Sequence, residues 1–335
     1  MQPVVKTHNN KTSNSKTTFM TILLNIVFPI FAIILAGYLC GRFKLLGDGS
    51  SEGLNKFVYW VALPALLFRA MSNVELEQVF DADFLGVYVG AQALTMLGAM
   101  LLGMLLFRNT LAEAGINGMN AIYGNTGFLG IPLALAAFGE AATVPTIITV
   151  VVNSAVVVAA ATLVVEFSLQ KGSASHGKVV WGVFKALLKN PMIIAPVLGI
   201  FWAMQPEPLP ASIDKFCELL GSAAGPCALF AIGLFLVGKP VSSGFKEVSV
   251  MTSIKLVIQP LLTWWLAMAV FDLSPLWTAV AVLMAATPTG AGSFVLALQY
   301  QLHVQRTSTI ILLSTVISVA TIFLLLQHYQ ALLIG

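Results

Sequence analysis

Two stretches of the sequence decide the fold, NTGFLGIPLAL at residues 125–135 and PTGAGSFVLAL at residues 288–298. They superpose without a gap at an offset of 163 residues (288 minus 125), and both keep Thr-Gly near the start and Leu-Ala-Leu at the end. Proline removes a backbone donor, and glycine tolerates a positive φ. A helix that contains either stretch should therefore break there.

The rest of the chain is too apolar for a protein that is soluble in water. Of its 335 residues 58% are hydrophobic and 9% are charged, against roughly 25% charged in soluble domains. A bilayer core of about 30 Å needs about 20 apolar residues per helix, so the chain can hold around ten spans. The apolar runs are continuous and do not alternate with a period of two, which favours helices over a barrel.

Charges, glycines and prolines divide the apolar sequence into candidate spans. These are about 20–41, 54–71, 84–107, 116–138, 143–168, 190–204, 212–237, 249–271, 275–300 and 307–333. The sixth is short and could begin earlier, in the amphipathic stretch from Val179 to Lys189, which otherwise reads as an interfacial helix.

Two further matches support an internal repeat. The offset of 163 carries Thr146-Ile-Ile148 onto Thr309-Ile-Ile311, and an offset of 162 carries residues 64–68 (PALLF) onto residues 226–230 (PCALF). A unit with an odd number of spans enters its second copy from the opposite side, so the halves should be inverted repeats. We expect a polar tail (1–19), a first five-helix repeat (20–170), a cytoplasmic link with an amphipathic helix (171–189) and a second five-helix repeat (190–335).

Lysines and arginines gather on one side of the predicted bundle. The loops after spans one, three, five, seven and nine hold most of them, whereas the opposite side holds only Lys215, with Arg69 at a span end. By the positive-inside rule the basic loops are cytoplasmic, which puts both termini outside. The lysines of the N-terminal tail oppose this orientation, but five loops favour it.

The matched breaks are the best candidate for a substrate site. Helices four and nine should cross near the middle of the membrane, where Pro132, Pro288 and Gly290 interrupt them, and half-helix N-termini favour anions. The simpler interpretation is that glycine and proline merely kink two membrane helices. Neutral donors cluster at the same places and can bind a carboxylate without burying a charge when the site is empty; they are Asn125, Thr126, Asn153 and Thr289.

Lys255 is a basic residue deep in a span, about two turns into the eighth. A lysine at mid-membrane costs roughly 2.5–3.5 kcal/mol on insertion scales. It could attract the anion, or its side chain could reach back to the cytoplasmic interface. Both interpretations stay open from the sequence.

Other classes of function find little support. Asp48, Asp81, Asp83, Asp214 and Asp272 lie at or beside loops, which argues against a cation antiporter built on buried aspartates. We find no hydrolase, zinc-protease or nucleotide-binding motif, and the three cysteines lack metal-site spacing. We expect no enzyme activity, cofactor, metal or nucleic-acid partner.

The chain resembles the auxin efflux carrier family, which includes bacterial malonate and malate carriers and plant auxin exporters. The resemblance runs from about Met20 to the C-terminus and rests on Asn125-Thr126 with Gly130-Ile131-Pro132-Leu133, on Pro288 and Gly290 with Phe294, Val295 and Tyr300, and on Asn153 followed by Glu166. The link from Lys171 to Lys189 is short, as in the bacterial carriers, whereas the long plant exporters have an extended loop there.

This resemblance implies a fold like that of sodium/proton antiporters and bile-acid symporters. Spans one, two, six and seven would form a scaffold, and the other six a moving transport domain. We expect a homodimer through the scaffold helices, surrounded by lipid in a bacterial inner membrane. We expect the protein to carry small mono- or dicarboxylates by an elevator mechanism. The alternatives are a sodium-coupled symporter of the same fold and a ligand-binding membrane sensor.

The charge pattern yields a topology prediction. Single cysteines placed at Ser173 and Ser243 lie in lysine-bearing loops, so a membrane-impermeant thiol reagent should label both only from the cytoplasm. Labelling of either from outside would reverse the orientation.

Overall fold

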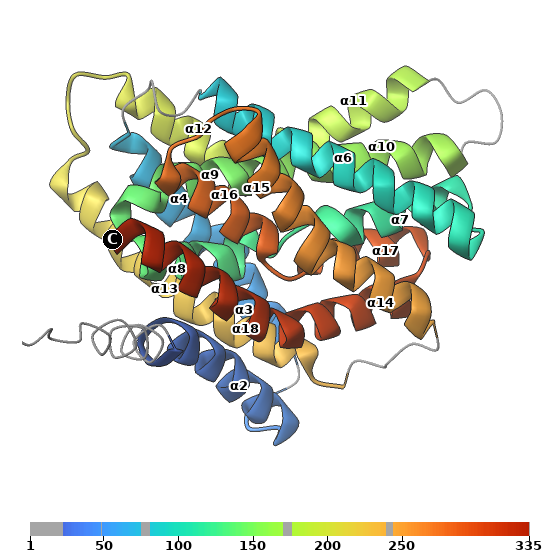
Figure 1. Ribbon diagram of the computed structural model, residues 1–335. Coiled ribbons are helices and arrows are strands. Elements are labelled where there is room, and N and C mark those ends of the chain that lie inside the picture. The colour runs from blue at the N-terminus through green and yellow to red at the C-terminus, as the bar shows by residue number, and fades with distance from the viewer. Residues whose placement is uncertain (1–22, 48, 75–80, 170–175, 239–243, 335) are drawn as a thin grey trace, which may run out of the picture.

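The computed structural model describes residues 23–47, 49–74, 81–169, 176–238 and 244–334. Every regular element in these ranges is a helix, and the helices form one bundle (Figure 1). The predicted N-terminal tail, residues 1–19, lies outside the described residues.

The helices occur in the following order along the chain. The first part of the chain contains η1 (Leu23–Val27), α2 (Phe28–Arg42), α3 (Ser50–Phe57), η2 (Val58–Ala62), α4 (Leu63–Ser72), α6 (Ala82–Phe107), α7 (Leu111–Ile122), η3 (Thr126–Gly130), α8 (Ile131–Phe138), η4 (Glu140–Ala142), α9 (Thr143–Val152), η5 (Asn153–Val157) and α10 (Val158–Leu169). The second part contains α11 (His176–Leu187), α12 (Pro191–Ala203), α13 (Ala211–Leu236), α14 (Phe245–Ser253), η6 (Ile254–Ile258), α15 (Gln259–Ala269), α16 (Pro275–Ala286), α17 (Ala291–Tyr300) and α18 (Val304–Ile334).

Several helices begin at polar caps that the sequence supplies. The Asp81 side chain accepts a hydrogen bond from the Phe84 amide at the start of α6. Thr110 and Glu113 form a capping box at the start of α7, and Asn190 caps α12. Such caps satisfy amides that the helix itself leaves free, which matters most where water is scarce.

Six continuous helical stretches in the described ranges are long and apolar enough to cross a membrane. They are Asn25–Arg42, Ala82–Phe107, Glu140–Leu169, Ala211–Leu236, Phe245–Ala269 and Val304–Tyr329. A seventh results if Val179–Leu187 and Pro191–Ala203 are counted as one span bent by 59°. The prediction of an all-helical membrane protein is confirmed at this level, and the amphipathic stretch is the helix α11.

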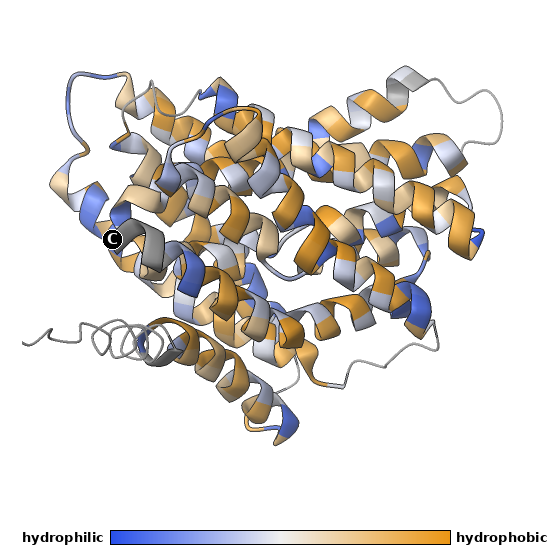
Figure 2. Cartoon of the chain, viewed as in Figure 1, coloured by the Kyte–Doolittle hydropathy of each residue, from blue (hydrophilic) through white to orange (hydrophobic). Residues whose placement is uncertain are grey.

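The outside of the bundle is apolar. Leu97, Leu101 and Leu105 of α6 are more than half exposed, as are Trp181 of α11 and Leu188, the residue after α11. Figure 2 shows hydrophobic colour along the outer helices. Contiguous exposed leucine and aromatic side chains suit a lipid surface and not water.

Helix α2 packs along α13 at the edge of the bundle (Figure 1) through glycines on both helices. A Cβ atom on Gly37 would overlap the Phe230 carbonyl, and one on Gly233 would overlap the Ile34 carbonyl. Only glycine allows the two backbones to approach so closely, as in other membrane helix pairs.

A buried carboxylate joins the ends of α7, α14 and α18. Glu247 accepts hydrogen bonds from Asn109 (2.6 Å) and Asn117 (2.7 Å) and forms an ion pair with Arg306 (2.6 Å). Burial lowers the pKa of the adjacent His303, whose Nε2 lies 2.9 Å from Arg306 Nη1. The pairing offsets the cost of burying the charge of Glu247.

Candidate functional site

The two interrupted helices meet backbone to backbone. Helix α7 ends at Ile122 and α16 at Ala286, and the chain then leaves the helical conformation for a few residues. The Asn125 amide donates to the Pro288 carbonyl (2.8 Å), and the Gly290 amide donates to the Tyr123 carbonyl (2.9 Å). These two bonds form an isolated antiparallel bridge between Gly124 and Thr289. We call residues 123–125 and 287–290 the paired breaks.

The first break is shorter than the glycine and proline pattern predicts. Helix resumes at Thr126 in η3 and continues into α8, so Gly127, Gly130 and Pro132 lie inside the second half-helix. The proline is tolerated because it follows the π-helical turn of η3, in the first turn of α8. Its ring faces Gly225 of α13.

Polar side chains hold each break in place. The Asn153 amide donates to Thr126 Oγ1 (3.0 Å) and to the Gly124 carbonyl (3.3 Å). The Thr289 hydroxyl donates to the Asn120 carbonyl (2.8 Å). Three of the predicted carboxylate donors are thus engaged within the protein in this conformation, and their role in binding stays a prediction.

Asn125 differs from these three residues. It is half-buried, and its side-chain amide has no hydrogen-bond partner among the described residues. Its backbone is fixed, because its carbonyl accepts from the Leu129 and Gly130 amides while its own amide bonds Pro288. The backbone therefore holds a free amide donor beside the bridge.

Lys255 is fully buried, and its ammonium bonds to polar groups inside the bundle and not at the membrane surface. It donates to Gln259 Oε1 (2.6 Å) and to the Ala285 carbonyl (2.5 Å). Gln259 in turn donates to the Ile122 carbonyl (3.2 Å). Ile122 and Ala285 belong to the last turns of α7 and α16, where the helix dipole is negative. The buried Lys255 side chain therefore bonds the C-terminal end of α16 directly and that of α7 through Gln259.

The polar contacts continue from Lys255 to the first break. Gln259 Nε2 donates to Gln92 Oε1 (2.7 Å), and Gln92 Nε2 donates to Asn153 Oδ1 (2.9 Å). Sequence reasoning missed both glutamines. Each is an amide in an otherwise apolar span, and that is a signal for an interhelical partner.

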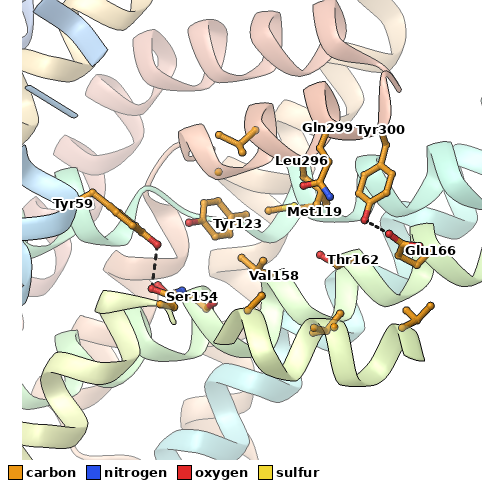
Figure 3. Close-up of a pocket in the computed structure, with 17 residues that line it drawn as sticks. Tyr59, Met119, Tyr123, Ser154, Val158, Thr162, Glu166, Leu296, Gln299 and Tyr300 are labelled. Atoms are coloured by element: carbon orange, nitrogen blue, oxygen red, sulfur yellow. Dashed lines mark hydrogen bonds between the residues drawn. The ribbon is translucent and has the colours of Figure 1, made fainter. Parts of the chain in front are cut away.

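A cavity of about 830 Å³ reaches the paired breaks. Tyr123 and Gly292 line it beside the breaks, and Glu166 and Tyr300 line it farther along α10 and α17 (Figure 3). A Cβ atom on Gly292 would lie 2.7 Å from the Tyr123 ring, so glycine is required where the ring covers the N-terminus of α17. This volume suits a small ligand with room for water.

The predicted residues and the cavity do not coincide completely. The lining of the cavity contains Tyr123, the first residue of one break, and Gly292, which follows the other. It does not contain Asn125, Thr126, Asn153, Thr289 or Lys255. The predicted residues surround the bridge from the inside of the bundle. Tyr123 lies between the cavity and these predicted residues.

Comparison with known proteins gives the family. The model of the membrane transport protein family, Mem_trans, matches residues 22–326. The chain belongs to this family. It is also called the auxin efflux carrier family, so the resemblance seen in the sequence is confirmed, and with it the general function of a membrane transporter.

Three relatives show the range of this family. A protein of Rhizobium meliloti (strain 1021) named "Putative malonate transporter" is 33% identical over 304 residues, which cover 90% of this chain and 94% of the relative. The Arabidopsis thaliana auxin efflux carrier component 8 is 24% identical, covering 89% and 95%. The Mus musculus lysosomal cholesterol signaling protein is 26% identical over 267 residues, which cover 76% of this chain but 30% of that longer protein.

The position of Lys255 yields a stability prediction. Lys255→Met leaves the Ala285 carbonyl and Gln259 Oε1 buried without this donor, which should cost about 1–3 kcal/mol and lower the melting temperature in detergent. Lys246→Met is the matched control, because Lys246 is exposed on α14. An unchanged melting temperature for Lys255→Met would show that the ammonium does not hold the helix ends.

Proposed function

We propose that this chain carries small organic anions, mono- or dicarboxylates, across the membrane by elevator-type alternating access. The observation that supports the proposal is the difference between the two kinds of helix end at the paired breaks. Their negative helix ends are bonded by Lys255 and Gln259, whereas the half-helices that begin after the breaks present N-termini.

Those N-termini suit an anion. Helix α17 begins directly after Gly290, and its second residue, Gly292, lines the cavity. The Ser293 hydroxyl is buried and has no hydrogen-bond partner among the described residues. Together with the free amide of Asn125, these groups could donate several hydrogen bonds to a carboxylate, while the helix dipole adds positive potential.

The substrate class follows from the kind of donor and from the relatives. Neutral donors at a helix end suit a compact anion that enters and leaves repeatedly, because these donors bring no charge of their own that must stay buried when the site is empty. The relative named for malonate is 33% identical, so malonate is the first substrate to test. In this proposal the site rearranges around the carboxylate, which then contacts the side chains of Asn125, Thr126, Asn153 and Thr289. The second break contains Pro288 and Gly290, and Pro132 lies in the half-helix that follows the first break.

The architecture that we propose has ten spans in two inverted five-helix repeats, with boundaries at about residues 20–170 and 190–335. Four spans join the six continuous ones if α3 to α4, α7 to α8, α11 to α12 and α16 to α17 each count as one. Spans one, two, six and seven would form the scaffold of a homodimer in a bacterial inner membrane, with both termini outside. The other spans would move past them.

Two alternatives make different predictions. In a sodium-coupled carrier, unwound carbonyls and half-helix C-terminal ends coordinate the ion; here the Lys255 ammonium bonds one such end, so we expect no sodium requirement. A membrane sensor is the second candidate, because one relative is named a signaling protein. A sensor would bind its ligand without moving it.

Uptake of labelled malonate into proteoliposomes tests the proposal. We expect saturable uptake that does not change when sodium is replaced by potassium, with empty liposomes as the control. Binding of malonate by the purified protein without uptake would favour the sensor. Uptake that stops without sodium would favour the symporter, and neither binding nor uptake of any small carboxylate would refute the proposal.

A further inference from the structure

Five buried polar side chains form one chain of hydrogen bonds that runs from η6 to the start of η3. Lys255 lies at one end and donates to Gln259 Oε1 (2.6 Å). In the middle, Gln92 Oε1 accepts from Gln259 Nε2 (2.7 Å), and Gln92 Nε2 donates to Asn153 Oδ1 (2.9 Å). At the other end, Asn153 Nδ2 donates to Thr126 Oγ1 (3.0 Å). We call these five side chains the amide relay.

Backbone carbonyls fix the direction of the bonds in the amide relay, because a carbonyl oxygen accepts and cannot donate. Gln259 has to turn its Nε2 toward the Ile122 carbonyl (3.2 Å), and Asn153 has to turn its Nδ2 toward the Gly124 carbonyl (3.3 Å). The side-chain oxygens of these two residues then face the donors that precede them. Each inner member of the relay therefore accepts from the member before it and donates to the member after it.

The amide relay ends at a hydroxyl whose own proton is not used. Thr126 Oγ1 accepts from Asn153, so its proton is directed elsewhere, and it meets no acceptor among the described residues. Thr126 is only 3% exposed and lies directly after the first of the paired breaks. Buried polar groups normally have partners for their protons. An acceptor on a ligand would complete this one.

Gln92 occupies the other end of the Asn153 amide, and this keeps the Thr126 proton free. Without Gln92, Asn153 could turn its amide over and accept the Thr126 hydroxyl at Oδ1, since neither orientation would then pair the whole amide. The hydroxyl proton would be used inside the protein and lost to a ligand. The middle of the relay thus controls a donor at its end.

We propose that Gln92, Gln259 and Lys255 raise the affinity for an anion without touching it, by directing the Thr126 hydroxyl to donate to a bound carboxylate. This inference rests on the proposed function. The three are positioning residues, and the donor that they direct is completed by a carboxylate oxygen but not by a cation. Bonds that point one way along a chain also polarise one another, so the terminal hydroxyl is a stronger donor than an isolated one.

A double-mutant cycle on malonate binding tests the amide relay, with the Kd measured by calorimetry on the purified protein. Gln92→Met cuts the relay but leaves the Lys255 ammonium in place, so it separates the relay from attraction by that charge. Thr126→Val keeps the shape of the side chain and removes the hydroxyl, whereas Thr126→Ser keeps the hydroxyl. Gln259→Met cuts the relay one bond earlier and gives the same test if Gln92→Met does not fold. Gln305→Met, at an exposed glutamine of α18, is the matched control.

Thr126→Val should raise the Kd about tenfold or more, the usual effect of losing a hydrogen bond to a charged group. Gln92→Met should raise it roughly threefold to tenfold, as for a bond between neutral groups. In the Thr126→Val background, Gln92→Met should change the Kd by less than about twofold, because no hydroxyl is left to direct. In the Thr126→Ser background the effect of Gln92→Met should return, and Gln305→Met should leave the Kd unchanged.

Two results would overturn this inference alone. One is an unchanged Kd for Gln92→Met. The other is an equal rise in the Kd with and without the Thr126 hydroxyl, which is what a merely structural role of Gln92 predicts. If the wild type binds no small carboxylate, the proposed function fails and this inference fails with it.

Discussion

The antiparallel bridge between Gly124 and Thr289 is the contact on which the rest of the site depends. Two helices end inside an apolar bundle, and each end leaves backbone groups that cannot find water there. The bridge pairs two of the freed amides with two carbonyls. Asn153, Thr289 and Gln259 bond further carbonyls at the ends of these helices. An interruption that would be costly for a single helix becomes tolerable because two helices share it.

This arrangement also places the C-terminal and N-terminal helix ends in different surroundings. Lys255 approaches the C-terminal end of α16 from the buried interior, and the cavity reaches the N-terminal end of α17 on the other side of the break. In the proposed mechanism, the Lys255 side chain on one side and the helix N-termini near the cavity on the other would favour an anion at the crossing. Tyr123 covers that N-terminus in the present conformation, so in the proposed mechanism an anion would have to displace its ring to reach the bridge. The proposed mechanism therefore links access and binding at one side chain.

Much of this could be predicted from the sequence. The repeat offset located both breaks, because glycine and proline have fixed backbone consequences, and Asn125 and Lys255 were recognisable as polar residues in apolar spans. The partners could not be predicted: Gln92 and Gln259 contact each other across 167 residues of sequence, and no local pattern encodes such a pairing. The position of Glu166 on a cavity wall depends on how α7, α10, α11 and α17 meet. The glycine and proline pattern also predicts a longer first break than the structure has, since Pro132 lies within α8.

The most direct test of the central claim, that an anion binds at the paired breaks, is a double-mutant cycle on malonate binding. Asn125→Ala and Thr289→Ala should each raise the Kd by an amount equivalent to about 1–3 kcal/mol, the usual effect of leaving a buried partner unpaired. The two effects should be non-additive, because both groups contact one ligand. Asn73→Ala, at the exposed end of α4, should leave the Kd unchanged. Wild-type affinity in the double variant would contradict the claim.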